Sequence, residues 1–159
     1  MGLDTSHDCW HGPYSAFMRW REWLADLAGI PLRLMEGFCE WTIDDSDLEW
    51  ATSLPFDTRR QCIEDLFRAL RGRTPLKWKG FEHDPITLLL DHSDCDGEIA
   101  WQDAGRIADR IEQLIAGIPD DLDALKPARA AYDGNVPAAR RWIKGLRDAF
   151  AKRENVEFR

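Results

Sequence analysis

The strongest constraint on the fold is a run of apolar side chains at helical spacing between residues 104 and 118. They recur every three or four residues, and Pro119 follows the last of them. This period puts them on one face of an α-helix, and a proline cannot continue that helix. The segment therefore predicts a helix that buries one face. Its apolar positions are Ala104, Ile107, Ala108, Ile111, Leu114, Ile115 and Ile118.

Three further segments carry the same period. One begins at Pro13 and is ended by Gly29, a second runs from about Asp57 to Leu70, and a third begins at Pro137 with Asn135 as its expected cap. Each predicts an amphipathic helix. The inward positions expected are Tyr14, Phe17, Trp20, Leu24 and Leu27; Ile63, Leu66, Phe67 and Leu70; and Ala139, Trp142, Ile143, Leu146 and Phe150.

The remaining segments are shorter. Residues 85–90 are interpreted as a short helix capped by Asp84, residues 30–56 as loop with short helical turns, and the terminal VEFR as a small strand. With 159 residues the chain is long enough for one hydrophobic core. We therefore predict a compact, mainly α, single-domain fold over residues 1–159, with about four main helices and a minor two-stranded β element.

Composition limits the function. No apolar run is long enough to cross a bilayer, and a net charge of −8 argues against binding of extended nucleic acid, which needs Lys and Arg to neutralise phosphates. The four cysteines show no CxxC spacing, and the amino-terminal residues are polar. These features predict a soluble protein of a reducing, cytoplasmic compartment.

The stretch HSDCDGEIAWQD, residues 92–103, resembles the EF-hand calcium loop. Carboxylates alternate before a turn glycine at position 97, as in that loop. A histidine stands first and an aspartate last, where calcium loops carry Asp and Glu, and imidazole is a poor ligand for calcium. A divalent metal (Zn, Mn, Mg or Ca) and a helix-capping acidic turn both remain open. The candidate metal ligands are His92, Asp94, Asp96 and Asp103.

A second histidine-rich stretch, SHDCWHG, occupies residues 6–12. If it meets residues 92–103 in space, imidazoles and carboxylates beside aromatic rings would form a small-molecule pocket. The alternative is a capping segment before the first helix, with exposed histidines. The candidate ligand-binding residues are His7, Asp8, Trp10, His11, Tyr14, Glu98 and Trp101.

Two basic runs interrupt the acidic sequence. One lies within residues 59–79, and the other consists of Arg140, Arg141, Lys144 and Arg147. Arginine forks recognise phosphates, so the first run is also compatible with one wall of a nucleotide pocket. Both runs are interpreted as solvated helix faces.

The segments GLDTSHDCWHGPYSAFMRWR and LLLDHSDCDGEI, with the terminal WIKGLRDAF, resemble a group of uncharacterised bacterial and phage proteins. The resemblance implies a prokaryotic or viral setting and transfers no activity. The first hypothesis is a binding protein that sequesters a small anionic, nucleotide-like ligand, with or without a metal. The alternatives are a metal-dependent hydrolase using the same residues, and a module that binds a protein partner, or a second copy, through Trp41 and Trp50.

Overall fold

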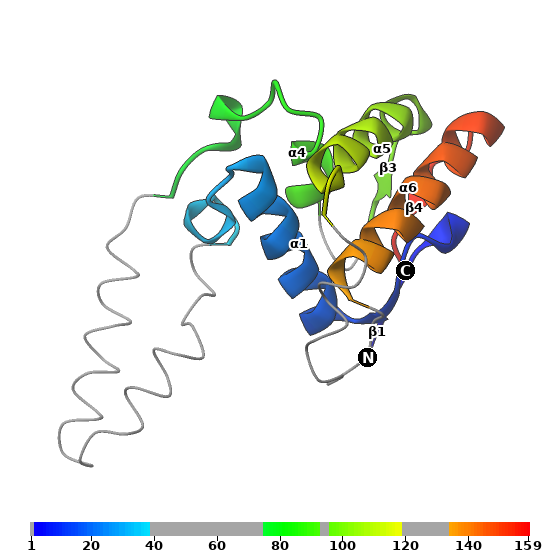
Figure 1. Ribbon diagram of the computed structural model, residues 1–159, viewed down its shortest axis with the longest axis horizontal. Coiled ribbons are helices and arrows are strands. Elements are labelled where there is room, and N and C mark those ends of the chain that lie inside the picture. The colour runs from blue at the N-terminus through cyan, green and yellow to red at the C-terminus, as the bar shows by residue number, and fades with distance from the viewer. Residues whose placement is uncertain (1, 39–74, 93–95, 119–133) are drawn as a thin grey trace, which may run out of the picture. The chain divides into compact units, whose positions relative to one another are not determined.

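The computed structural model describes residues 2–38, 75–92, 96–118 and 134–159, which fall into two compact units, Met1–Ile30 with Lys79–Arg159, and Pro31–Trp78. The described elements are mainly helices, with two small antiparallel strand pairs, so the predicted fold class is confirmed (Figure 1). Three of the described helices are long, namely α1 (Tyr14–Ala28), α5 (Trp101–Ile115) and α6 (Asn135–Lys152), and α4 (Thr87–Leu90) is a short helix of four residues. Strand β1 (Gly2–Asp4) pairs with β2 (His11–Pro13), and β3 (Glu98–Ile99) with β4 (Val156–Glu157). Short helical turns are η1 (Ser6–Asp8), η2 (Leu32–Leu34) and η3 (Trp78–Gly80).

Helix α1 has the boundaries that the sequence predicts. It follows Pro13 and ends at Gly29, whose φ of 71° is a left-handed conformation that a residue without Cβ adopts at little cost. Phe17, Trp20 and Leu24 are buried as expected. Leu27 is 37% exposed, so its predicted inward position is wrong: it lies at the edge of the apolar face.

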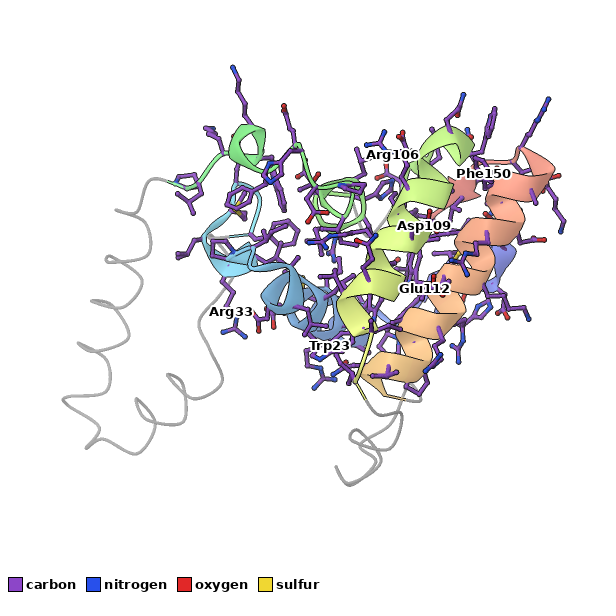
Figure 2. The ribbon with its side chains drawn as sticks, turned by 45° about the horizontal axis from the view of Figure 1, so that its top comes forward. Trp23, Arg33, Arg106, Asp109, Glu112 and Phe150 are labelled. Atoms are coloured by element: carbon purple, nitrogen blue, oxygen red, sulfur yellow. The ribbon has the colours of Figure 1, made fainter. Side chains whose placement is uncertain are left out.

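Helices α5 and α6 pack side by side in the first unit (Figures 1 and 2). Asp109 and Glu112 of α5 bind Arg147 of α6, whose Nη2 lies 3.2 Å from Asp109 Oδ1 and 2.8 Å from Glu112 Oε2. One of the predicted solvated arginines therefore joins the two helices. The apolar residues between them include Ile107 and Leu146, both fully buried.

Two predictions about α6 are wrong. Asn135 is the first helical residue rather than the cap, because Gly134 with a φ of 104° occupies the capping position. Phe150 is 49% exposed and not inward-facing. Its ring lies over Gly105 of α5 and 6.1 Å from the ring of Trp101, so it covers the outer edge of the helix pair (Figure 2).

The short helix α4 confirms the helical interpretation of residues 85–90. Asp84 accepts a hydrogen bond from the Ile86 amide at 3.0 Å and so caps the turn, as expected. The same carboxylate is held by Arg110 of α5, with Nε at 2.9 Å and Nη2 at 2.8 Å from Oδ2. A half-buried pair of this geometry joins α4 to α5.

A cluster of aromatic rings forms the centre of the first unit. Trp20 and Trp142 stack with centroids 5.6 Å apart and an interplanar angle of 8°, and Phe17 lies 5.9 Å from Trp142. Trp10 and Phe158 pack at 5.2 Å and 6.2 Å from Phe17. These five rings come from the residue before β2, from α1, from α6 and from the carboxyl terminus. The cluster therefore joins segments that are far apart in the sequence.

The carboxyl-terminal segment pairs with two other parts of the chain. The Phe158 amide donates to Gly97 O at 3.0 Å, while the Arg159 amide donates to Asp4 O at 2.8 Å. The Glu157 amide donates to Ser6 Oγ at 2.8 Å. The small strand predicted for VEFR is confirmed as β4. It contacts both the amino-terminal segment and the loop before α5.

The guanidinium of Arg21 lies inside the first unit. It is 2% exposed, donates to His92 O at 2.7 Å, and lies 4.7 Å from the ring centroid of Phe17. It also donates to Leu90 O at 3.4 Å. A cation of α1 therefore binds two carbonyl oxygens at the carboxyl-terminal end of α4. The position of the chain after α4 is thereby set from α1.

The second unit has its own short pairings. The Leu76 amide donates to Leu34 O at 2.8 Å, and the Glu36 amide donates to Leu76 O at 2.9 Å. Lys77 Nζ lies 2.6 Å from Glu36 Oε1, and Trp78 Nε1 donates to Glu36 O at 3.1 Å. The turn η2 agrees with the short helical turns predicted after residue 30.

Several predicted features lie outside the described residues. They are the helix over 57–70, most of the basic run within 59–79, Trp41 and Trp50. Among the helices that the structure does describe, none is both long and apolar enough to span a membrane.

Replacing Phe158 by Ala tests whether the carboxyl-terminal segment is part of the core. Because Phe158 is 5% exposed, we expect the free energy of unfolding in urea to fall by about 3–5 kcal/mol, the usual cost of a buried Phe→Ala change. Phe150→Ala is the control, since Phe150 is 49% exposed. Equal losses in the two variants would contradict the packing described for this segment.

Candidate functional site

A hollow of about 470 Å³ lies in the first unit between η1 and α6. Three of its lining residues, Arg141, Lys144 and Asp148, come from α6 at spacings of three and four, which place them on one helix face. The other two, His7 and Asp8, come from η1. All five side chains are titratable or charged, so the hollow is suited to a polar ligand.

Turn η1 approaches α6 closely because α6 has a glycine at the contact. A Cβ on Gly145 would lie 2.6 Å from His7 O and in collision with Cys9 Sγ. Both neighbours belong to the segment that connects β1 to β2, and one of them is a backbone atom that cannot rotate away. Gly145 therefore brings the histidine-rich stretch onto α6.

The backbone of η1 is in an unusual conformation. His7 and Asp8 have φ values of 57° and 56°, which non-glycine residues seldom adopt. Two successive residues of this kind cost free energy that the surrounding contacts must supply. The result is that both side chains face the hollow beside α6.

The imidazole of His7 is fixed by carboxylates. Its Nδ1 lies 2.8 Å from Asp148 Oδ2 and its Nε2 3.5 Å from Glu154 Oε2, and the side chain is only 7% exposed. Asp148 is also bound by Lys152 at 2.8 Å. The contacts with Lys152 and then with His7 hold the pKa of Asp148 below its usual value. Its negative charge is thus already compensated.

His11 lies beside the hollow and is bound on both ring nitrogens. Nδ1 is 2.9 Å from Asp4 Oδ1, and Nε2 is 2.7 Å from Asp8 Oδ1. The hydrogen bond with Asp4, followed by that with Asp8, raises the pKa of His11. The carboxylate of Asp8, like that of Asp148, therefore already has a cationic partner.

Lys144, a cation of the same hollow, differs from these carboxylates. Among the residues that the structure describes, Lys144 has no hydrogen bond or ion pair to a side chain, and it is exposed. Arg141 lines the same hollow from the preceding helical turn. The lining therefore combines two cations, Arg141 and Lys144, with two carboxylates that are already bound by other side chains.

The aromatic residues predicted to line a ligand site lie elsewhere. Trp10 is 1% exposed within the aromatic core, and Tyr14 is half-buried at the start of α1. Trp101 packs against Phe150 and lies 5.8 Å from the guanidinium of Arg153. None of the three lines the hollow. Of the predicted ligand-binding residues, His7 and Asp8 do line it.

The stretch 92–103 makes separate contacts. The ring of His92 stacks on Phe158 with centroids 3.9 Å apart, and Asp103 Oδ1 binds Arg106 at 3.1 Å. Asp96 and Glu98 are exposed, and Asp94 lies outside the described residues. Within the described ranges, no three His, Cys, Asp or Glu side chains are grouped as metal ligands. The metal site at His92, Asp94, Asp96 and Asp103 stays a prediction.

Both histidine-rich stretches border the carboxyl-terminal segment. Thr5 forms a bridge with Phe158, and Gly97 O accepts from the Phe158 amide at 3.0 Å. Their imidazoles nevertheless have different partners, since His7 binds carboxylates and His92 stacks on a phenyl ring. Among the described residues, no group of metal-ligating side chains joins the two stretches.

Sequence reasoning missed the contribution of α6. It noted Arg141 and Lys144 but interpreted them as a solvated face, and it did not select Asp148. The available signal in the sequence is the helical spacing of these three residues around Gly145. Such a pattern indicates a helix face on which a small residue allows another segment to pack closely.

No protein-family model matches the chain, and no curated protein or solved structure matches it significantly. The resemblance to bacterial and phage proteins stays a prediction.

Replacing Gly145 by Ala tests the contact that forms the hollow. We expect the free energy of unfolding to fall by about 1–3 kcal/mol, the usual cost of overpacking, because a Cβ meets the backbone of η1. Gly105→Ala is the matched control on α5, where the added Cβ meets only the exposed ring of Phe150 at 3.3 Å. There we expect a gain of up to about 1 kcal/mol from helix propensity. Urea denaturation of both variants measures these changes in the free energy of unfolding. An unchanged free energy of unfolding for Gly145→Ala would refute the close contact between η1 and α6.

The thiol of Cys9 gives an independent test. Burial raises its pKa to about 12, so the reactive thiolate is scarce near neutral pH. In a variant with Cys39, Cys62 and Cys95 changed to Ser, we expect iodoacetamide to label the native protein far more slowly than the same protein in urea. Mass spectrometry measures the label. Equal rates in the two conditions would mean that this segment does not pack on α6.

Proposed function

We propose that the protein binds a small oxyanion-bearing ligand, a phosphate or phosphomonoester, in the hollow between η1 and α6. The observation that carries this proposal is the convergence of Lys144 and Arg141 on a hollow whose two carboxylates, Asp8 and Asp148, already have cationic partners. An added anion would give Lys144 an ionic partner that no described side chain provides.

The size and chemistry of the hollow support this ligand class. Its volume of about 470 Å³ lies within the range of small-molecule sites. A guanidinium offers paired N–H donors to an oxyanion, and an ammonium adds a compact positive charge. No Trp or Tyr ring lines the hollow, so a nucleotide-like ligand would be recognised through its phosphate rather than its base.

The backbone of η1 gives a second reason. Left-handed conformations at non-glycine residues cluster at binding and catalytic sites, where the strain is retained for function. His7 and Asp8 are two successive residues of this kind, and both line the hollow. The strained turn holds their side chains in position before any ligand arrives.

The other hypotheses remain predictions. A metal-dependent hydrolase would depend on Asp94, and a partner-binding module on Trp41 and Trp50, all of which lie outside the described residues. A zinc, manganese, magnesium or calcium cofactor, oligomer formation and a cytoplasmic, prokaryotic or phage setting also stay predictions. We favour the anion-binding proposal because all five residues that line the hollow lie within the described part of the chain.

Calorimetry with inorganic phosphate and a nucleoside monophosphate tests the proposal. We expect Lys144→Gln and Arg141→Gln each to raise the Kd about tenfold or more, because a hydrogen bond to a charged group contributes about 1.5–3 kcal/mol. The control is Arg106→Gln, which removes an exposed cation of α5 outside the hollow and should leave the Kd unchanged. Absence of binding to the wild-type protein, or an equal Kd for Lys144→Gln, would refute it.

A further inference from the structure

We propose that His11 is a positioning residue that makes the hollow receptive to anions, by holding the carboxylate of Asp8 in an ion pair. This inference rests on the proposed anion site. It adds that the ligand binds together with the proton carried by His11, although His11 does not itself line the hollow.

The geometry requires that proton. A neutral imidazole has one N–H donor and one acceptor nitrogen, whereas a carboxylate is only an acceptor. His11 has a carboxylate oxygen at 2.9 Å on Nδ1 and another at 2.7 Å on Nε2. Both nitrogens must donate for both contacts to form, so the arrangement is that of an imidazolium.

Asp8 connects this cation to the hollow. Its Oδ1 binds His11, and its side chain also forms part of the lining beside His7 and Lys144. Deprotonation of His11 leaves one donor for two carboxylates. An uncompensated Asp8 then places a negative charge next to the proposed ligand, which opposes Lys144 and repels an anion.

The groups that set the protonation of His11 come from two elements. Asp4 of β1 faces His11 in the strand register, and Asp8 comes from η1. Helix α1 also packs against β2 but adds no charge to those that raise the pKa of His11 among the described residues. His11 therefore keeps its proton above its ordinary pKa of about 6.5 and loses it at higher pH.

The proposed coupling has a definite sign. Anion affinity is greatest where His11 is protonated, and it falls as the pH rises through the raised pKa of His11. Phosphate monoesters change their own charge near pH 6, whereas sulfate keeps the same charge over this range, so sulfate is the better probe of the protein's titration. By reciprocity, saturating sulfate must raise the pKa of His11 measured by NMR.

A double-mutant cycle of His11→Gln and Asp8→Asn tests the coupling by sulfate calorimetry. Both side chains are largely exposed, at 54% and 73%, so the variants should fold. We expect His11→Gln alone to weaken binding roughly two- to fivefold, the range for an exposed charge pair. In the Asp8→Asn background the same change should have no effect, because no carboxylate then needs compensation. Far-ultraviolet circular dichroism checks that each variant is folded.

The outcomes separate the two proposals. An equal loss in both backgrounds would mean that His11 acts only on the structure of the strand pair, and it would overturn this inference. Unchanged binding by His11→Gln, or a His11 pKa that does not respond to sulfate, would overturn the inference but leave the anion site intact. No binding of phosphate or sulfate by the wild-type protein would overturn both.

Discussion

The backbone pairing of the carboxyl-terminal segment is the interaction on which the first unit depends. Residues 155–159 donate and accept hydrogen bonds with the amino-terminal segment at Asp4 and with the loop before α5 at Gly97. Between these bonds, Phe158 inserts its ring among the aromatic side chains of α1 and α6. These backbone hydrogen bonds join the carboxyl-terminal segment to the amino-terminal segment. They therefore help to hold the histidine-rich stretch at residues 6–12 beside α6, independently of the side-chain contacts in the hollow.

The helices could be predicted because the residues that determine where a helix begins and ends are close together in the sequence. The period of apolar residues, a terminal glycine and a proline gave the boundaries of α1 and α5 within a few residues. The errors occurred where a neighbouring element decides the outcome. Phe150 has the right spacing for burial, but its ring lies over Gly105 of α5 and stays 49% exposed. Gly134 takes the cap that Asn135 would otherwise provide.

The site was less predictable because it depends on contacts between distant segments. His7 and Asp8 attract attention in the sequence as a histidine beside a carboxylate, but nothing local indicates that they face α6. That arrangement depends on Gly145, where a Cβ would meet His7 O at 2.6 Å. A glycine inside a helix usually lowers the stability of that helix. Gly145 is informative because of its position between Lys144 and Asp148, which both line the hollow.

The distribution of charge reconciles an acidic protein with an anion site. A net charge of −8 disfavours long polyanions, whose affinity comes from many phosphate contacts made at once. A compact oxyanion responds instead to the few charges around it, and residues 134–147 contain four cations and no carboxylate. The acidic side chains nearest the hollow are each bound by a cation or an imidazole. In the proposed anion site, the ion pairs made by Asp8 and Asp148 would therefore matter as much as Lys144, because they set the charge that an anion meets in the hollow.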